Sequence, residues 1–398
     1  MIDFRNPYTP GAGCSPQYLA GRDEILQNAR YAIDAIAEGY PARSFVYYGL
    51  RGVGKTVILN HIEEYAEEQE LLCRHIEVKD GSDFVKQLSI ACTGFVSALS
   101  LRENLKEKLG KLISVLRAFS ATYNPEDKTI SLELKDVPLT EISTAGSGNL
   151  ENDFTELLVT LGKYTKQAGT AICFCIDEIQ YATENELSSL IAADHRINQL
   201  GLPVIFFCAG LPKILKNLGD AGSYAERLFS FVEIGRLSEE DSSKAIRIPA
   251  ERLGVRYTDE AIRRIIQETD GYPYFIQELC STIWKNHDSK EVDANAVNAN
   301  IDATNAILDK GFFRVRYDRC TNMEKQFMAA MASCDTLPCN IGNVARIMDK
   351  KTNSISIYRS QLISKGLIYS TSHGEIDFTV PQFSAFLKRT HPEMIKEI

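Results

Sequence analysis

Short apolar runs separated by longer stretches with helical spacing make up residues 1–236. The strand-like runs are residues 45–48, 73–78, 170–176, 204–208 and 231–234. Between them, apolar residues recur every three or four positions, which is typical of amphipathic helices. Because strands alternate with helices, the pattern predicts an α/β fold in which a parallel sheet lies between two helical layers.

One segment between the second and third strands breaks this alternation. Residues 84–119 keep helical spacing throughout and predict a single long helix. Residues 129–134, Thr-Ile-Ser-Leu-Glu-Leu, alternate as a half-buried strand does, after an Asn-Pro-Glu-Asp turn. We interpret residues 120–142 as a small hairpin insertion in the core.

The pattern changes twice after the last strand. Residues 237–310 hold four helical runs without a strand pattern, which predicts an all-α lid domain. Residues 311–398 begin with three helical runs and end in two alternating stretches around a Ser-His-Gly turn, the order found in a winged helix. We therefore expect three domains: a core over 1–236, a lid over 237–310 and a winged helix over 311–398.

Composition is that of an ordinary globular protein, 44% hydrophobic and 24% charged over 398 residues. No apolar run approaches the roughly 20 residues needed to cross a bilayer, and the N-terminus lacks the pattern of a signal peptide. The ten cysteines include no C-x-x-C pair and no His at zinc spacing. These features predict a cytoplasmic protein with reduced core thiols and no membrane partner.

Charge is distributed unevenly along the chain. The net charge is −9, yet residues 311–398 hold 12 Lys and Arg against 8 Asp and Glu, a balance of +4. The remaining 310 residues hold 32 against 45, a balance of −13. An acidic body with a basic final domain suggests that an anionic partner contacts that domain.

The most specific motif follows the first strand. Residues 49–56 read Gly-Leu-Arg-Gly-Val-Gly-Lys-Thr, the G-x-x-x-x-G-K-[ST] phosphate loop, between a strand and a helix start. Glycines let the backbone turn its N–H groups toward phosphate oxygens, and the helix dipole adds positive potential. We expect Lys55 to reach the β- and γ-phosphates of ATP and Thr56 to ligate Mg²⁺. The predicted nucleotide contacts here are Gly49, Arg51, Gly52, Val53, Gly54, Lys55, Thr56 and Val57.

A second motif ends the third strand with two acids, Asp177 and Glu178. Phosphoryl transfer requires positioning and charge neutralisation, so one acid must hold the metal and the other must orient the attacking water. We assign Asp177 to Mg²⁺, through its waters, and Glu178 to the water. The alternative is a strand that ends in a solvated turn, which the upstream phosphate loop disfavours. Together the motifs predict a Mg²⁺-dependent ATPase with a P-loop NTPase core.

With these motifs, residues 17–398 resemble the AAA+ ATPases, and more narrowly the branch of origin-recognition ATPases and STAND-type NTPases. Residues 20–24, Ala-Gly-Arg-Asp-Glu, are similar to the family's "GRE" motif, and residues 271–273, Gly-Tyr-Pro, lie where the lid meets the nucleotide. The resemblance implies that Gly21 and Arg22 lie against the adenine and that Pro273 lines the nucleotide between core and lid.

Two departures from the family pattern stand out. Where many relatives end the sensor 1 strand in Asn or Thr, this chain has Cys208 and Ala209. Where many carry a sensor 2 Arg in a lid helix, residues 272–275 are Tyr-Pro-Tyr-Phe. Both departures favour a slow switch over a processive motor.

Arg227 precedes the last strand, where AAA+ subunits present an arginine finger to a neighbour's γ-phosphate. An Arg here would make hydrolysis depend on assembly of a homo-oligomer. The alternative is a surface Arg paired with Glu226 or Asp220.

Residues 353–365 are the candidate reading helix of the winged helix. Polar side chains on such a helix contact base edges, and nearby cations contact phosphates. The predicted duplex DNA contacts are Lys350, Lys351, Asn353, Ser354 and Arg359. Against this, the wing tip at residues 372–375 has no Lys or Arg, and winged helices in STAND proteins often serve only as packing or regulatory modules.

The motifs and the resemblance together predict an ATP-binding switch that cycles between ATP and ADP, assembles with ATP and acts on DNA in replication, transposition or mobile-element biology. The alternative is a STAND-type signalling or defence ATPase that works through a protein effector. We recognise no effector domain in this sequence, which leaves a separate effector subunit or no effector at all.

Overall fold

The computed structural model describes residues 5–81, 83–101, 109–125, 145–222 and 224–395. Every structural statement below concerns these residues. They form two compact units. The core unit comprises Arg22–Tyr48 and Lys55–Glu233. The second unit comprises the N-terminal arm up to Gly21, the loop Gly49–Gly54 and the chain from Ile234 onward.

The core unit is built on a five-stranded sheet in the order β2-β3-β4-β1-β5, in which every neighbouring pair is parallel. The prediction of a parallel α/β fold is therefore confirmed. The strands are β1 (Ser44–Tyr48), β2 (Leu72–Glu77), β3 (Ile172–Asp177), β4 (Val204–Gly210) and β5 (Phe229–Glu233).

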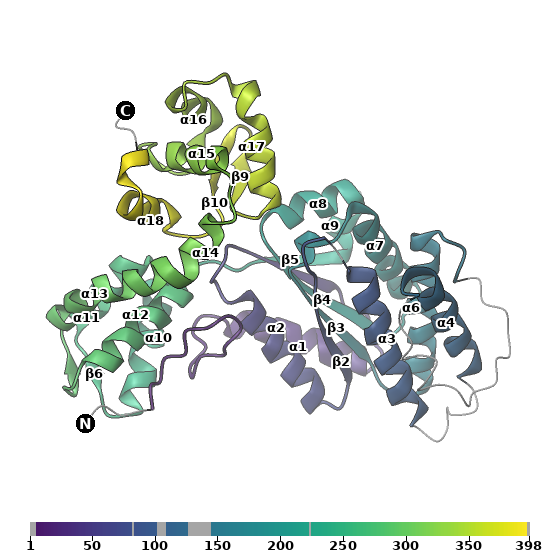
Figure 1. Ribbon diagram of the computed structural model, residues 1–398. Helices are drawn as coiled ribbons and strands as arrows, with labels where there is room; N and C mark the ends of the chain where they lie inside the picture. Colours follow the sequence, from purple (N-terminus) through teal and green to yellow (C-terminus); the bar gives the residue numbers. More distant parts are fainter. Residues whose placement is uncertain (1–4, 82, 102–108, 126–144, 223, 396–398) are drawn as a thin grey trace. The chain divides into compact units, whose positions relative to one another are not determined.

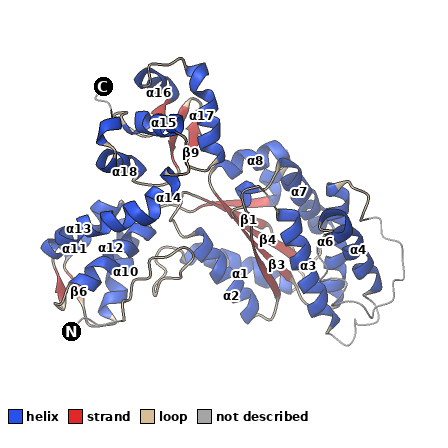
Figure 2. Ribbon diagram, viewed as in Figure 1, coloured by secondary structure: helices blue, strands red, loops and turns tan. Residues whose placement is uncertain are grey.

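Helices cover both faces of this sheet, as Figures 1 and 2 show. The continuous burial of β3 and β4 explains why these strands are almost wholly apolar. On one face, Phe174 and Phe206 stack within the largest hydrophobic cluster, with their ring centroids 5.2 Å apart. On the other, Phe45 and Phe207 stack at 5.5 Å. The covering helices are α1 (Asp23–Ala37), α2 (Lys55–Glu68), α3 (Phe84–Ser100), α4 (Gly110–Tyr123), α6 (Leu150–Gln167), α7 (Glu184–Gln199) and α8 (Lys213–Ala221).

The prediction of one long helix over residues 84–119 is wrong. Helix α3 ends at Ser100 and α4 begins at Gly110, and the two pack against each other, with Ser89 Oγ and Ser120 Oγ 2.5 Å apart. Both helices bury an apolar face, so helical periodicity alone cannot show that the chain turns back. Of the predicted insertion, residues 120–123 belong to α4, and residues 126–144 lie outside the described residues.

Four helices follow the sheet, as predicted, but residues 237–310 are not wholly helical. A parallel pair of two-residue strands, β6 (Arg256–Tyr257) and β7 (Glu291–Val292), joins the loops between them. Strands this short leave no periodic signal, which is why the sequence pattern missed them. The helices are α10 (Glu239–Glu251), α11 (Asp259–Thr269), α12 (Pro273–Asn286) and α13 (Ala294–Leu308).

The C-terminal segment, residues 314–395, contains helices around a small antiparallel sheet of order β8-β10-β9. Three helices and a hairpin occur in the predicted order, and the structure adds helix α14, strand β8 and helix α18. The elements are α14 (Arg314–Tyr317), α15 (Asn322–Ala332), β8 (Cys339–Asn340), α16 (Ile341–Ile347), α17 (Thr352–Ser364), β9 (Ile368–Ser372), β10 (Glu375–Phe378) and α18 (Phe383–Thr390).

Two further predictions can be compared with the described residues. Among the helices that the structure describes, none is long and apolar enough to cross a membrane. All ten cysteines are free, and only Cys14 is exposed.

Candidate nucleotide-binding and catalytic site

Thr56 and Asp177, 121 positions apart in the chain, meet at the carboxyl edge of the core sheet. The Thr56 hydroxyl donates a hydrogen bond of 2.6 Å to Asp177 Oδ2. Helix α2 begins at Lys55, directly before Thr56, and β3 ends at Asp177. The meeting follows from the parallel sheet, because the chain leaves both strands at the same edge.

The side chains of Lys55 and Asp177 are buried, and charges interact more strongly in a buried site than in water. Lys55 is 9% exposed and Asp177 is 5% exposed. Burial raises the pKa of Asp177, and the charge of Glu178 acts in the same direction, while the hydrogen bond from Thr56 and the charge of Lys55 oppose the rise. A cation bound here would relieve the cost of burying this carboxylate.

Glu178 is held in a defined orientation. Its backbone lies in the left-handed region with φ 53°, which is uncommon for a residue with a side chain. Its N–H donates to Asp177 Oδ1 at 2.8 Å, and its carboxylate Oε2 accepts a hydrogen bond from the Gln180 amide. The hydrogen bond from the Glu178 backbone thus fixes the two acids relative to each other. The Gln180 side chain in addition holds the Glu178 carboxylate.

Gln180 is the site residue that the sequence did not reveal. It is 3% exposed, and its Oε1 accepts a hydrogen bond of 2.9 Å from the backbone N–H of Leu211. Gln180 therefore connects Glu178 to the end of β4, where Cys208 and Ala209 are both buried. The only signal in the sequence is a glutamine two residues after the acid pair. No spacing rule predicts the short 3₁₀ turn, Ile179–Tyr181, that carries it.

The phosphate-loop backbone needs its glycines. Gly52 has φ 81° and Gly54 has φ 96°, both in the region that favours glycine. Within the second unit, Tyr274 N–H donates to Gly52 O at 3.2 Å, and Arg51 N–H donates to Thr379 O at 3.0 Å. A Cβ at Gly52 would lie 3.0 Å from the Cβ of Tyr274, so a side chain there would also crowd this contact.

The other predicted nucleotide contacts remain predictions, each with a defined local setting. Gly21 has φ 64°, and a Cβ there would lie 2.7 Å from a carboxylate oxygen of Asp241. Arg22 is buried at the start of α1, and Pro273 is the first residue of α12. Arg227 is exposed in the short helix α9 (Ala225–Leu228), and the described residues give it no ion pair with Glu226 or Asp220.

The donor set at Asp177 fits Mg²⁺. A hydroxyl and a carboxylate are hard oxygen ligands, and Mg²⁺ in nucleotide sites takes only one or two protein ligands while keeping its waters and phosphate oxygens. No group of three or more His, Cys, Asp or Glu residues that could hold a metal occurs in the described part of the chain. When bound, the ion would neutralise charge on the phosphates.

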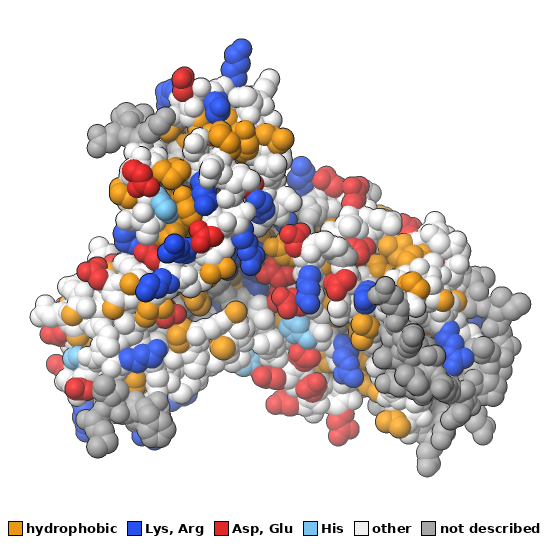
Figure 3. Space-filling view, viewed as in Figure 1, with side chains coloured by type: hydrophobic (Ala, Val, Ile, Leu, Met, Phe, Trp, Pro, Cys, Tyr) orange, Lys and Arg blue, Asp and Glu red, His pale blue; other side chains and the backbone are white. Residues whose placement is uncertain are grey.

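The predicted DNA contacts lie at or near α17 in the C-terminal segment. Lys350, Lys351, Asn353 and Ser354 are exposed. Arg359 is half-buried and donates a hydrogen bond of 2.8 Å to Ser370 Oγ, in the adjoining strand β9. Figure 3 shows several Lys and Arg side chains on the visible face of this segment.

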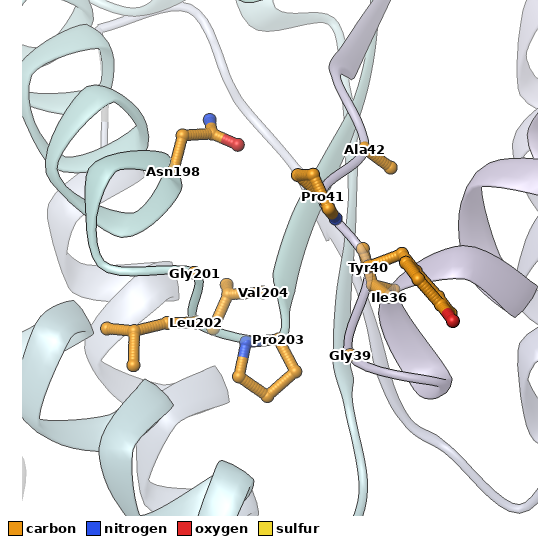
Figure 4. A pocket seen from close by; sticks show the side chains of 10 residues that line it. All are labelled: Ile36, Gly39, Tyr40, Pro41, Ala42, Asn198, Gly201, Leu202, Pro203 and Val204. Atoms are coloured by element: carbon orange, nitrogen blue, oxygen red, sulfur yellow. The ribbon is translucent and has the colours of Figure 1, made fainter.

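A small hollow in the core unit lies at the opposite edge of the sheet from the acid pair (Figure 4). The loops that precede β1 and β4 form it, and Pro41 and Pro203 both line it. Because the amino ends of parallel strands carry none of the predicted chemistry, we do not assign the site to this hollow.

Residues 18–207 match the family model described as "AAA ATPase domain". The recognition of an AAA+ P-loop ATPase from the motifs is thus confirmed over this stretch, and the narrower origin-recognition/STAND-like branch stays a prediction. Residues 310–387 match a second model, described as a domain of unknown function (DUF8462). Among proteins with curated descriptions, none matches the chain.

Similar solved structures extend over nearly the whole chain. The Walker-type ATPase of Pyrococcus abyssi is 12% identical, with a TM-score of 0.54, over 97% of this chain and 99% of that one. The Orc1 protein of Aeropyrum pernix, solved with DNA, is 14% identical, with a TM-score of 0.46, over 94% of each chain. The RuvB Holliday junction branch migration motor of Thermotoga maritima is 14% identical, with a TM-score of 0.43, over 93% and 95%. At identities this low, a structural likeness is evidence of the fold and not of the function. Of the three structures, we use only the first as support for the fold.

Proposed function

We propose that this chain is an ATP-driven switch of the origin-recognition/STAND-like branch that binds Mg·ATP and hydrolyses it slowly. The observation that carries the proposal is the 2.6 Å hydrogen bond between Thr56 and Asp177, beside buried Lys55. It unites the two halves of a phosphoryl-transfer site from distant parts of the sequence.

In the proposed reaction, Lys55 would neutralise the β- and γ-phosphates, and Thr56 and Asp177 would hold Mg²⁺, which would supply further positive charge. Glu178 accepts a proton from the attacking water as the new P–O bond forms. The bond between the γ-phosphorus and the bridging oxygen breaks, and ADP and phosphate leave. Gln180 keeps the Glu178 carboxylate aimed, because its amide is itself anchored on Leu211.

Slow turnover is supported by what the site lacks in its described residues. The end of β4 presents Cys208 and Ala209 in place of a polar sensor, and the first turn of α12 contains no Arg. Fewer groups are therefore poised to sense the γ-phosphate, which suits a switch that stays ATP-bound for long periods. Arg227 would complete the site in trans when ATP assembles a homo-oligomer.

The C-terminal segment is the proposed DNA-binding module, a winged helix with α17 as its reading helix. Three helices and the sheet β8-β10-β9 support this assignment, as does the +4 charge balance of residues 311–398. Lys350 and Lys351, exposed at the start of α17, would contact phosphates. Asn353 would face base edges. Ser354, bonded to Lys351 O, and Arg359, bonded to Ser370 Oγ, would contact DNA only if these hydrogen bonds opened.

The test is ATP hydrolysis by the full chain with and without duplex DNA, together with mass measurement with and without ATP. Stimulation by duplex DNA and ATP-dependent assembly would support the proposal. Assembly without any response to DNA would favour the signalling alternative with a protein effector. Hydrolysis that is absent, or equally fast in Glu178→Gln, would overturn the assignment of the catalytic site.

A further inference from the structure

Helix α17 presents one face to solvent along its whole length. Asn353, Ile357 and Gln361 are all exposed and recur every four residues, so they form a single stripe. The buried side of the helix, with Ile355 and Leu362, packs into the hydrophobic cluster of the C-terminal segment. The stripe therefore lies on the face opposite to the packed one.

Several other polar groups on or next to α17 are engaged by the protein itself. Ser354 Oγ donates to Lys351 O at 2.7 Å, and Ser356 Oγ donates to Asn353 O at 2.8 Å. Lys365, directly after the helix, is paired with buried Glu324 at 2.7 Å. Arg359 is likewise bonded to Ser370. The large side chains of this helix that point outward are therefore those of the stripe.

Ile357 is the unexpected member of the stripe, because 58% of this β-branched apolar residue is exposed. It lies between two amide side chains, one turn of helix from each. A single exposed apolar residue needs no explanation by itself. Here, however, an apolar group flanked by two amides forms a combination with a defined recognition chemistry.

That chemistry is the reading of A·T base pairs. Asn and Gln amides bond in bidentate fashion to adenine N6 and N7, and an apolar side chain contacts the thymine methyl group. Guanine is read chiefly by Arg or Lys, and the stripe contains neither. From Asn353 to Gln361 the helix rises eight steps, or about 12 Å, and base pairs are spaced about 3.4 Å apart, so the stripe covers about four base pairs.

We propose that Asn353, Ile357 and Gln361 form a reading surface for A·T-rich duplex DNA in the major groove. The inference rests on the proposed DNA-binding function and gives it a sequence class. Lys350 and Lys351 lie exposed just before the helix and supply cations for nearby phosphates. The +4 balance of residues 311–398 favours a polyanion as the occupant of this face.

The experiment is fluorescence anisotropy of the full chain, at low salt and with ATP, on three labelled duplexes of equal length. One has an A·T core, one has a G·C core, and one has the A·T core with deoxyuridine in place of thymidine, which removes only the 5-methyl groups. We expect roughly 10-fold tighter binding to the A·T duplex than to the G·C duplex. The deoxyuridine duplex should bind with intermediate affinity.

Variants assign the discrimination to individual side chains. Asn353→Ala and Gln361→Ala should each reduce the A·T preference severalfold while leaving the G·C affinity unchanged. Ile357→Ala should weaken binding to the thymidine duplex but not to the deoxyuridine duplex. Gln326→Ala, an exposed glutamine on α15, is the matched control and should change nothing.

The outcomes separate the inference from the function on which it rests. Equal affinity for all three duplexes would overturn the reading surface and leave general DNA binding intact. A loss of affinity that is the same on every duplex in the stripe variants would also overturn it. No binding to any duplex would overturn the proposed DNA function and this inference together.

Discussion

The acid pair at the end of β3 and the exposed face of α17 are organised in opposite ways. At β3, Asp177, Glu178 and Gln180 are joined by hydrogen bonds to one another, to Thr56 or to backbone. On α17, Asn353 and Gln361 extend into solvent from a rigid helix. Interlocked groups respond to substitution as a unit, whereas separated groups contribute nearly additively. The first arrangement suits chemistry, and the second suits the reading of a surface.

The largest expected effect is at the interlocked site. Glu178→Gln should keep ATP binding and lower kcat by about 10³-fold, because the amide keeps the shape but cannot accept the proton. Lys55→Ala should abolish ATP binding, since it removes the charge facing the phosphates. Nucleotide binding and steady-state turnover measure the two effects separately. Wild-type turnover in Glu178→Gln would show that another group is the base.

Arg227→Ala should give the next largest effect, about a 10²-fold loss of turnover with unchanged ATP binding. If Arg227 acts in trans, wild-type specific activity should rise with protein concentration. Mixing in Lys55→Ala subunits should then change activity nonlinearly. A rate that is independent of both concentration and this substitution would make Arg227 a surface residue.

Substitutions of Gln180 test whether the hydrogen-bonded network around Glu178 extends to this residue. Gln180→Met removes both of its hydrogen bonds and should lower kcat by about 10-fold with little change in KM. Gln180→Glu keeps an acceptor for Leu211 N–H but places a second negative charge beside Glu178. It should lower kcat further than Gln180→Met does, because repulsion between the two neighbouring carboxylates turns Glu178 away from the water. Gln199→Leu, an exposed glutamine on α7, is the control. A kcat that is equal in Gln180→Glu, Gln180→Met and the wild type would limit Gln180 to a packing role.

On the C-terminal side, effects should be smaller and additive. Replacing Lys350 and Lys351 together by Ala should flatten the log–log salt dependence of DNA binding by about 1.8 units, from two lost phosphate contacts. All duplexes should weaken alike, since phosphate contacts carry no sequence information. Titrations at several salt concentrations give the slope. A loss of affinity that depends on base sequence would contradict the assignment of phosphate contacts to the two lysines and of base contacts to the stripe.

The smallest effect on activity is expected at a buried acid away from the site. Asp194 on α7 is fully buried and accepts a hydrogen bond of 2.9 Å from Ser44 Oγ. Burial raises its pKa to about 7, although the hydrogen bonds from Ser44 and Asn198 oppose the rise. Because the folded pKa lies above the unfolded one, the folded state binds the proton more tightly. Stability should therefore fall as pH rises from about 4 to 7 and level off above, by at most ~4 kcal/mol.

Asp194→Asn should remove most of this pH dependence while leaving turnover unchanged. Asp220→Asn, at an exposed position on α8, should not. Denaturant unfolding between pH 5 and pH 8 measures the difference. A wild-type unfolding free energy that stays constant over this range would show that Asp194 keeps an ordinary affinity for its proton.

What the amino-acid sequence determined by itself was local. The phosphate loop at 49–56, the acids at 177 and 178, and the five strands of the core could be predicted, because each depends on neighbouring residues and short-range periodicity. Helix capping is equally local: the Ser238 and Thr258 side chains accept hydrogen bonds from backbone N–H groups three residues on.

Tertiary structure decided everything that depends on distant partners. The strand order that brings Thr56 to Asp177, the break between α3 and α4, and the anchoring of Gln180 on Leu211 all arise from contacts between residues far apart in the chain. The sequence was enough to identify α17 as a helix. Only the structure shows which of its polar side chains bond to the protein and which point outward. Periodicity reports which face of a helix is apolar, and only the packed neighbours determine which polar groups on the other face are already bonded.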